Sequence, residues 1–367
     1  MTYLFATTTN YKNGKLTGAH RRFLELVKEF SKTSKVILIS GDISQSELNE
    51  NITWHKIENP KIKFLPYHLS GMLHISRQLH KLKKNLKYDI AVSFSPMITI
   101  CYKKAGIKNI VTLFREDVVG YQKSVYASKF RIWYFGRQER KAVKASQKVI
   151  VQCKSDRDNL ISRNKKYYKD IESKVYVQIN NANASWMKTE LIFKQKNNDA
   201  VKVLFIGNFS DKRKGHQLLL PASARLLDEG VKFELLIAGD GSELEWYQSK
   251  YSKYLSIKFL GRVNEMEKYL SQSDFMIVPS LIDSCPNTVL EGLNAGIAVY
   301  GAKTGGIPDL LVNDEYMFEP TEEGIYSFLK NVLQNERFVT DSATQSERKK
   351  SLTFDWGKQI ADLIMKE

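Results

Sequence analysis

Short apolar stretches alternate with longer amphipathic stretches along the whole chain, and this alternation restricts the fold more than any other feature. Apolar residues over Gly18–Ser31 recur at helical spacing, whereas Lys35–Ser40 reads as a buried strand. Repeated strand–helix units predict an α/β fold with parallel sheets and helices on both faces. The expected strands are Tyr3–Thr8, Lys35–Ser40, Ile90–Phe94, Ile110–Phe114, Val149–Cys153, Val175–Ile179, Val201–Ile206, Phe233–Ala238, Ile257–Leu260 and Phe275–Pro279.

The length of the chain, 367 residues, fits two domains of ordinary size. An Asn-rich turn at 180–183 leads into a polar joint at 185–199. We therefore expect a first Rossmann-like domain over residues 1–190 and a second over residues 191–350. A last helix over residues 351–367 is expected to be amphipathic, because Phe354, Trp356, Ile360, Leu363 and Ile364 can share one face.

The composition favours a globular protein of a reducing compartment. Apolar residues make up 43% of the chain, which is ample for two cores. The opening residues read as a buried strand and not as a signal peptide, and no apolar run has the length of a membrane span. Cys101, Cys153 and Cys285 are few and far apart, which argues against a disulfide framework. We expect a cytoplasmic protein.

The net charge of +16 is confined to the first half of the chain. Residues 1–190 hold 35 basic and 15 acidic residues, or +20, and the remainder holds 21 and 25, or −4. Such asymmetry indicates an anionic partner for the first half: phospholipid, nucleic acid or a polyanionic acceptor.

The segment 279–296 carries the sharpest functional signal. Here a strand ends in a short loop that contains Asp283, and a helix begins near Asn287 and contains Glu291. Free amides at a helix N-terminus favour an anion, and a carboxylate one turn further on can bind a diol such as ribose. The alternative is a capped helix with an ordinary solvated glutamate.

A second segment, 206–215, follows the first strand of the second half. Gly207 permits close backbone approach, and Lys212, Arg213 and Lys214 supply cations at the edge of a parallel sheet. Alone, such a basic loop is more often a solvated surface turn. Two further strands end in glycine-rich loops, at 237–241 and 301–308, so that several strand ends of one sheet would meet around a phosphate-bearing ligand.

Taken together, these segments resemble the group 1 family of retaining GT-B glycosyltransferases. The resemblance is most specific over residues 201–310 and extends weakly to the first glycine loop, to 149–155 and to Phe354-Asp-Trp356. It implies two Rossmann-like domains that face across a cleft, a C-terminal helix that crosses back to the first domain, and a donor held mainly by the second domain. It also makes the first domain the acceptor-binding one.

Roles for individual residues follow from this resemblance. Glu291 would bind the ribose, Asp283 the hydroxyls of the donor sugar, and Lys214 the diphosphate. The implied catalytic residues are Lys214, Arg213 and Asp283. The implied donor-binding residues are Gly18, Gly207, Asn208, Gly239, Cys285, Asn287, Thr288, Val289 and Glu291, with backbone amides contributing from Cys285 to Val289.

Two positions depart from the family pattern. Asn208 stands where the family usually has an arginine after the glycine of the basic loop, and Arg213 is a candidate to compensate. Arg115 stands where the family often has a histidine at the end of a strand in the first domain. The donor preference and the acid–base roles depend on these two positions.

Other constellations have simpler explanations. Asp156-Arg-Asp158 could bind a metal, but its place at a helix start favours capping. His68, His74 and His80 are spaced by six residues and spread around a helix axis, so no metal site is expected. The basic, aromatic stretch Tyr121–Lys144 would suit nucleic acid, although that reading leaves the donor segments without a role.

The sequence thus predicts a nucleotide-sugar-dependent hexosyltransferase with a UDP-sugar as the expected donor, no other cofactor and no metal. The expected acceptor is a lipid-linked or cell-surface glycan, and no nucleic acid partner is expected. A non-hydrolysing sugar-nucleotide epimerase of similar architecture, and a basic nucleic-acid-binding protein, remain the alternatives. Leucines and lysines over His68–Lys87 predict a helix on the anionic inner face of the plasma membrane, with a normal domain helix as the alternative. The aromatic and basic residues of Tyr121–Lys144 make that segment the second candidate for a membrane contact.

Overall fold

The computed structural model describes residues 1–8, 18–57, 67–183 and 200–366. These residues form two compact units. Unit 1 comprises Met1–Gln178 and Asp355–Glu367, and unit 2 comprises Ile179–Phe354. The joint predicted at 185–199 lies outside the described residues, and the chain changes unit at Gln178 and again after Phe354.

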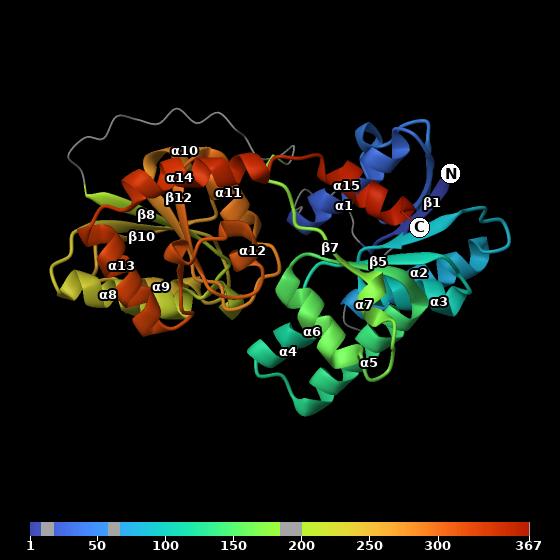
Figure 1. Cartoon of the computed structure of the whole chain (residues 1–367), viewed down its shortest axis with the longest axis horizontal. Helices are drawn as coiled ribbons and strands as arrows, with labels where there is room; N and C mark the ends of the chain where they lie inside the picture. The colour runs from blue at the N-terminus through green and yellow to red at the C-terminus, as the bar shows by residue number, and fades with distance from the viewer. Residues whose placement is uncertain (9–17, 58–66, 184–199, 367) are drawn as a thin grey trace. The chain divides into compact units, whose positions relative to one another are not determined.

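Unit 1 is built on a seven-stranded parallel sheet with the order β3-β2-β1-β4-β5-β6-β7 (Figure 1). The first strand lies inside the sheet and pairs with β2 on one side and β4 on the other, which is the switch point of a doubly wound fold. The strands are β1 Thr2–Ala6, β2 Lys35–Ser40, β3 Ile52–Lys56, β4 Ile90–Ser93, β5 Ile110–Phe114, β6 Ser146–Val151 and β7 Val175–Val177.

Strand β3 was not predicted, because its sequence, Ile-Thr-Trp-His-Lys, contains too few apolar residues to read as a buried strand. It forms the edge of the sheet and pairs with β2 from Val36↔Ile52 to Ser40↔Lys56. An edge strand has a neighbouring strand on one side only, and here only Ile52 is buried, so the remaining side chains can be polar.

Helices cover both faces of this sheet (Figure 1). They are α1 Gly18–Ser31, α2 Tyr67–Leu82, α3 Pro96–Ala105, α4 Val118–Ser124, α5 Lys129–Ala145, α6 Lys154–Asn164 and α7 Ile171–Lys174, with a 3-10 turn at Gln45–Glu47.

The apolar stripe of α2 is used by the core. Ile75 and Leu79 are fully buried, and Met72, Leu82 and Leu86 pack against the same cluster. Among the described residues of this segment only Leu73 is a largely exposed apolar side chain. The prediction that α2 lays an apolar face on a membrane is therefore wrong, because the sheet already covers that face.

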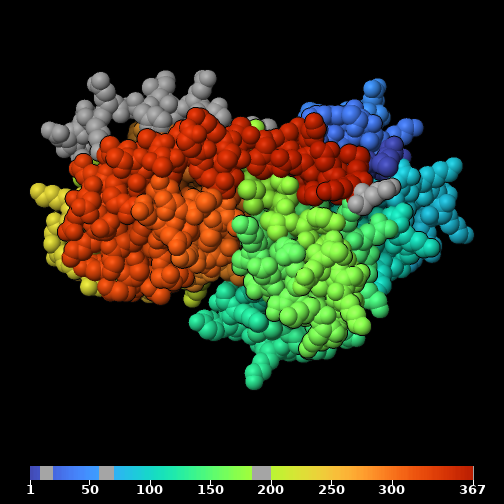
Figure 2. Space-filling view, viewed as in Figure 1, coloured from blue at the N-terminus to red at the C-terminus, as the bar shows by residue number. Residues whose placement is uncertain are grey.

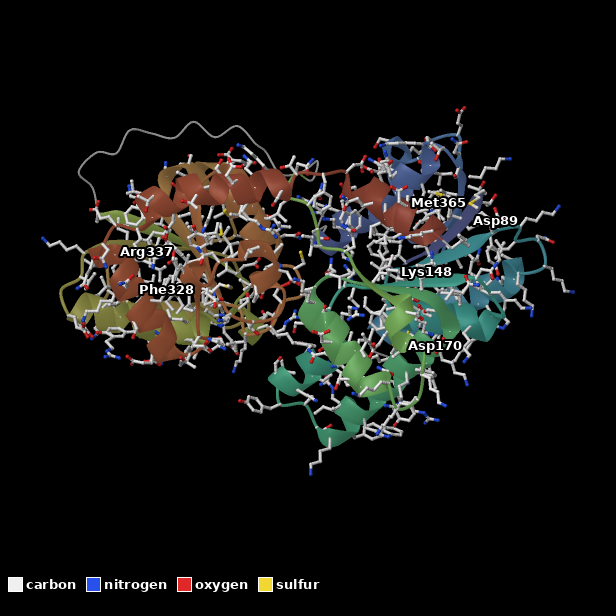
Figure 3. The ribbon with its side chains drawn as sticks, in the orientation of Figure 1. Asp89, Lys148, Asp170, Phe328, Arg337 and Met365 are labelled. Atoms are coloured by element: carbon white, nitrogen blue, oxygen red, sulfur yellow. The ribbon has the colours of Figure 1, made fainter. Side chains whose placement is uncertain are left out.

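The last helix, α15 Trp356–Met365, belongs to unit 1 and packs on α1, as predicted for a C-terminal helix that returns to the first domain. The Arg22 guanidinium lies 5.2 Å from the centre of the Trp356 ring, and Gln178 donates to the Gln359 side chain at 2.7 Å. Lys148 Nζ donates to the Leu363 carbonyl at 3.0 Å and lies beneath the last turn of this helix (Figure 3). The space-filling view shows α15 in red directly beside the blue N-terminal segment of unit 1 (Figure 2).

Unit 2 is built on a six-stranded parallel sheet with the order β10-β9-β8-β11-β12-β13. The strands are β8 Val201–Ile206, β9 Phe233–Ala238, β10 Ile257–Gly261, β11 Phe275–Val278, β12 Ala298–Ala302 and β13 Met317–Phe318. The helices are α8 His216–Asp228, α9 Leu244–Lys250, α10 Met266–Gln272, α11 Asn287–Ala295, α12 Ile307–Leu311, α13 Glu322–Gln334 and α14 Phe338–Ser351, with 3-10 turns at Lys212–Lys214 and Asp314–Tyr316.

A side chain completes this sheet where a strand is too short. Strand β13 pairs with β12 only from Gly301 onward, which leaves the backbone of Val299 without a strand partner on that side. The Gln345 amide of α14 fills the gap by accepting from Val299 N at 2.8 Å and donating to Val299 O at 2.9 Å. Buried backbone groups need such partners, so this glutamine fixes α14 to the sheet.

Candidate functional site

The loops that follow β8 and β9 lie in backbone contact at the carboxyl edge of the unit 2 sheet. Gly207 N donates to Ala238 O at 3.0 Å, and Phe209 N donates to Asp240 O at 2.8 Å. A Cβ on Gly239 would lie 1.8 Å from the carbonyl oxygen of Gly207, so only glycine fits there. Two of the predicted donor-binding glycines are thus brought together, and Asn208 follows directly, with its side-chain oxygen accepting from Ser210 N.

The basic loop forms the 3-10 turn Lys212–Lys214, which Asp211 caps by accepting from Arg213 N. The Arg213 guanidinium turns back onto the same carboxylate, with Nη2 2.7 Å from Asp211 Oδ2. Burial raises the pKa of Asp211, but the hydrogen bonds and charge of Arg213 outweigh it and the pKa is lowered. Arg213 is therefore engaged in holding the turn, and this geometry gives no support to its compensating for Asn208.

Lys214 and Asp283, predicted from separate segments, form an ion pair. Lys214 Nζ lies 2.8 Å from Asp283 Oδ2, and the two side chains retain 26% and 20% of their exposure. The turn is tied to the Asp283 loop by Leu281 N, which donates to Arg213 O at 2.7 Å. A cation and a carboxylate thus stand together at the sheet edge, both within reach of solvent and of a ligand.

The loop after β12 holds Asp283 from the other side. Gly306 N donates to Asp283 O at 2.8 Å, and Thr304 Oγ1 donates to Leu281 O at 3.1 Å. Gly305 has a positive φ of 57°, and a Cβ there would lie 2.2 Å from Asp283 O. The glycine-rich segment at 301–308 is therefore needed to position the Asp283 backbone.

Helix α11 begins beside this pair. Its N-cap position is Pro286, and no side chain caps it, so the first amides of the helix are available to an anion. Val289 N already donates to Pro286 O at 3.1 Å, so the amides expected to meet the donor reduce to those before Val289. Glu291 lies half-buried in the second turn of the helix, where a ribose-binding carboxylate was predicted.

The remaining predicted donor-binding residues in α11 and in the loop before it differ in exposure. Asn287 and Thr288 are half-buried, whereas Cys285 is buried. The Cys285 sulfur accepts from Asn180 N at 3.4 Å, so this residue can meet a ligand only through its backbone.

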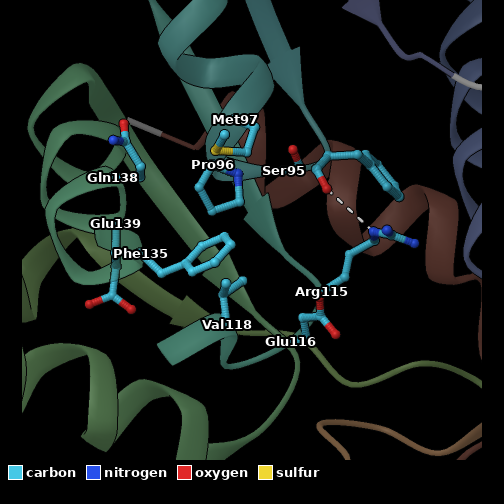
Figure 4. Close-up of a pocket in the computed structure, with 10 residues that line it drawn as sticks. Ser95, Pro96, Met97, Arg115, Glu116, Val118, Phe135, Gln138 and Glu139 are labelled. Carbon is cyan, nitrogen blue, oxygen red and sulfur yellow. Dashed lines mark hydrogen bonds between the residues drawn. The ribbon is translucent and has the colours of Figure 1, made fainter. Parts of the chain in front are cut away.

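In unit 1, the side chains of His20 and Arg115 lie near each other at the carboxyl edge of the sheet. Gly18 opens α1, and His20 follows in the first turn. Burial lowers the pKa of His20, and the nearby charge of Arg115 lowers it further. Arg115 Nε donates to Phe94 O at 3.3 Å (Figure 4). Sequence reasoning singled out Arg115 but missed His20, whose only signal was its place beside Gly18.

A cavity of about 170 Å³ opens next to Arg115 (Figure 4). Its floor is held by Glu139, which accepts from Arg163 at 2.8 Å and from Asn164 at 2.8 Å. Burial raises the pKa of Glu139 against the effect of Arg163. Sequence reasoning missed this cavity, because its walls come from three separate segments, 94–97, 115–118 and 135–139. Its lining residues are Phe94, Ser95, Pro96, Met97, Arg115, Glu116, Val118, Phe135, Gln138 and Glu139.

No group of His, Cys, Asp and Glu side chains that could hold a metal ion occurs among the described residues. The side chain that caps α6 is Cys153, whose sulfur accepts from Asp156 N at 3.3 Å, and not an aspartate as predicted. Asp156 is buried in the first turn, whereas Asp158 is exposed. Within the part of the chain described by the structure, no helix is both long and apolar enough to span a bilayer.

The architecture of the chain defines its fold. Two units, each built on a parallel, doubly wound sheet, form the GT-B fold. Comparison with known structures agrees: the Anabaena protein HepE, solved in complex with UDP and glucose, covers 100% of this chain and 99% of its own, with a TM-score of 0.70 at 15% identity. That likeness establishes the fold.

Residues 200–335, which lie in unit 2, match the family model described as glycosyl transferases group 1, and the chain as a whole has the GT-B fold. A Campylobacter jejuni relative is named GalNAc-alpha-(1->4)-GalNAc-alpha-(1->3)-diNAcBac-PP-undecaprenol alpha-1,4-N-acetyl-D-galactosaminyltransferase. It is 24% identical over 366 residues, which cover 94% of this chain and 95% of the relative. Protein CapJ of Staphylococcus aureus is 25% identical over 185 residues, 45% of this chain, and the match spans about half (47%) of CapJ.

Proposed function

We propose that the protein is a retaining glycosyltransferase that moves a hexose from a UDP-sugar to a lipid-linked or cell-surface glycan. The observation that carries the proposal is the Lys214–Asp283 pair at the open N-terminus of α11. A diphosphate sugar offers a counterpart to each group: phosphate oxygens for Lys214 and the helix amides, and sugar hydroxyls for Asp283.

The proposed reaction breaks the bond between the anomeric carbon and the diphosphate oxygen and forms a bond from that carbon to an acceptor hydroxyl. Negative charge grows on the leaving diphosphate as the bond breaks. Lys214 and the amides that precede Val289 are fixed donors aimed at that charge, a type of contact worth on the order of 10²–10³ in rate. The acceptor proton passes to the leaving phosphate oxygen, and no dedicated base is required. Retention at the anomeric carbon rests on the family resemblance.

Two related proteins support the choice of substrates. HepE, which has the same fold, was solved in complex with UDP and glucose. The name of the Campylobacter jejuni relative gives an undecaprenol-diphosphate-linked acceptor. By analogy we assign a UDP-sugar donor and a lipid-linked glycan acceptor. We propose a metal-independent reaction because Lys214 offers a cation to the diphosphate. We propose a peripheral position at the inner face of the plasma membrane because a lipid-linked acceptor is presented there. In unit 1 the cavity beside Arg115 is the candidate acceptor pocket.

A panel of nucleoside diphosphates and nucleotide sugars, screened for thermal stabilisation of the protein, tests the donor assignment. UDP and one UDP-sugar are expected to raise the melting temperature more than their ADP and GDP counterparts. The stabilising sugar is then incubated with lipid-linked acceptors, and the anomeric configuration of the product is read by NMR. Inversion would overturn the assignment of mechanism, and release of UDP with an epimerised sugar would mean that the protein is an epimerase.

A further inference from the structure

The corner between α4 and α5 in unit 1 exposes large apolar side chains that the core does not use. Val125, Tyr126, Phe130 and Trp133 are 37%, 96%, 70% and 51% exposed. The opposite side of α5 faces inward through buried residues such as Ala142 and Val143. We call the four exposed apolar residues and the basic residues around them the α4–α5 surface. Its basic members are Lys123, Lys129, Arg131, Arg137, Lys141 and Lys144.

Two of the apolar members contact each other at the surface. The rings of Phe130 and Trp133 pack at 5.8 Å between centroids, and the Arg137 guanidinium lies 5.6 Å from the centre of the Trp133 ring. Tyr126 has a positive φ of 51°, an unfavourable backbone for a residue with a Cβ, and its side chain points into solvent. The ring contact holds Phe130 and Trp133 together at the surface, and Tyr126 adds a third exposed aromatic side chain.

The charge of the α4–α5 surface is of one sign. Residues 118–145 contain seven basic residues and one acidic residue, Glu139. That glutamate is 3% exposed and pairs with Arg163 on the inner side, so it does not offset the outer charge. None of the six basic members forms an ion pair with another residue that the structure describes.

We propose that the α4–α5 surface docks unit 1 on an anionic lipid bilayer. Aromatic side chains with apolar bodies and polar edges settle at the headgroup level, and flanking lysines and arginines attract anionic lipid. The inference rests on the proposed function in one respect, since a lipid-linked acceptor is presented at such a surface. An RNA strand is the other occupant that a basic, aromatic surface can take, and binding to RNA is therefore one outcome of the test.

The test uses the full-length protein and sedimentation with vesicles of phosphatidylcholine, with and without 30 mol% phosphatidylglycerol as a chosen composition of roughly physiological charge. Two multiple variants probe the surface. The first replaces its aromatic members by serine, as Tyr126→Ser, Phe130→Ser and Trp133→Ser. The second replaces four basic members by glutamine, as Lys123→Gln, Lys129→Gln, Arg131→Gln and Arg137→Gln.

Helix α2 and the turn after it supply a control of matched charge. Four lysines there are exposed and form no ion pair with any residue that the structure describes, and they lie in the same unit. The control replaces them as Lys81→Gln, Lys83→Gln, Lys84→Gln and Lys87→Gln.

Wild-type protein is expected to bind the anionic vesicles, with binding that weakens as salt rises. One basic contact near an anionic surface is worth roughly fivefold in partition. The basic variant should therefore lose at least about tenfold, even if only two of its four contacts form. The aromatic variant should lose a similar factor but keep the salt dependence, and the α2 control should change by less than about threefold.

Tryptophan fluorescence gives an independent readout. Vesicle binding should shift the emission of the wild type to shorter wavelength, and the shift should vanish in Trp133→Phe although that variant still sediments. Equal binding by all variants, a larger loss in the α2 control, or surface-dependent binding to RNA without binding to vesicles would each overturn the inference. Stabilisation by UDP, measured on the same variants, reports the donor site separately, so a failure of the proposed function is distinguishable from a failure of this surface.

Discussion

Replacing Lys214 by methionine should separate the catalytic role of this residue from its structural one. The substitution keeps the length of the side chain and removes its charge. In the structure the charge is paired with Asp283 at 2.8 Å, and about a quarter of the Lys214 side chain remains exposed. A pair in such a position contributes at most about 1 kcal/mol to folding.

The catalytic effect should be much larger. If Lys214 meets the diphosphate, the charge it faces increases as the glycosidic bond breaks. Loss of one fixed donor of this kind lowers the rate by on the order of 10²–10³, or about 2.7–4 kcal/mol in the barrier. The fall should appear chiefly in kcat, because the interaction is stronger in the transition state than with the bound donor.

The assay measures release of nucleoside diphosphate from the donor identified by thermal screening, with melting curves run alongside. Lys330→Met is the matched control, because Lys330 also forms an ion pair in unit 2, with Glu229 at 2.9 Å, but on α13. We expect near-normal turnover from Lys330→Met and a loss of two to three orders of magnitude from Lys214→Met. If Lys214→Met melts normally and keeps more than about a third of the wild-type kcat, the donor has been placed at the wrong residues.

Three further outcomes are expected. Glu291→Ala should weaken UDP binding in calorimetry by roughly tenfold or more. A UDP analogue without the 2′ and 3′ hydroxyls of the ribose should bind the wild type no better than it binds the variant. Equal UDP affinity in both proteins would remove Glu291 from the site. Turnover should persist in EDTA, and a complete loss restored by Mn²⁺ or Mg²⁺ would contradict the metal-independent reaction. His216 is fully buried against Phe209, and burial lowers the pKa of its imidazole. Below about pH 6.5 the unfolded chain therefore binds a proton at this histidine more readily than the folded protein does. Urea titrations should show the unfolding free energy falling below that pH by up to about 1.4 kcal/mol per pH unit, and a flatter profile in His216→Phe; an unchanged profile would assign the titration to another group.

Much of the fold followed from local patterns in the sequence. Buried parallel strands such as Phe275–Val278 need unbroken apolar runs, and a run of this kind is visible without knowledge of its neighbours. The edge strand Ile52–Lys56 escaped notice because only Ile52 is buried, so the strand has no apolar run. The donor segments were also visible locally, because glycines at strand ends and a helix start are features of consecutive residues.

Contacts between distant segments could not be predicted in the same way. Lys214 and Asp283 are separated by 69 residues, and only the register of β8 beside β11 brings their loops together. Arg213, one residue from Lys214, turns instead onto Asp211, which is two residues away in sequence. Nothing in a run of three cations distinguishes the one that faces the site from the one that holds the turn.

The two basic segments of unit 1 show most directly what tertiary structure decided. The sequence predicted a helix over His68–Lys87, where α2 lies, and singled out Tyr121–Lys144, where α5 lies, as a stretch that mixes aromatic residues with lysines and arginines. It did not determine which apolar residues would be covered. The sheet buries Ile75 and Leu79 of α2, whereas no neighbouring element covers Phe130 and Trp133 of α5 enough to take them out of water. Whether an apolar side chain is buried depends on what packs against it, and the residue pattern of a single helix carries no information about its neighbour.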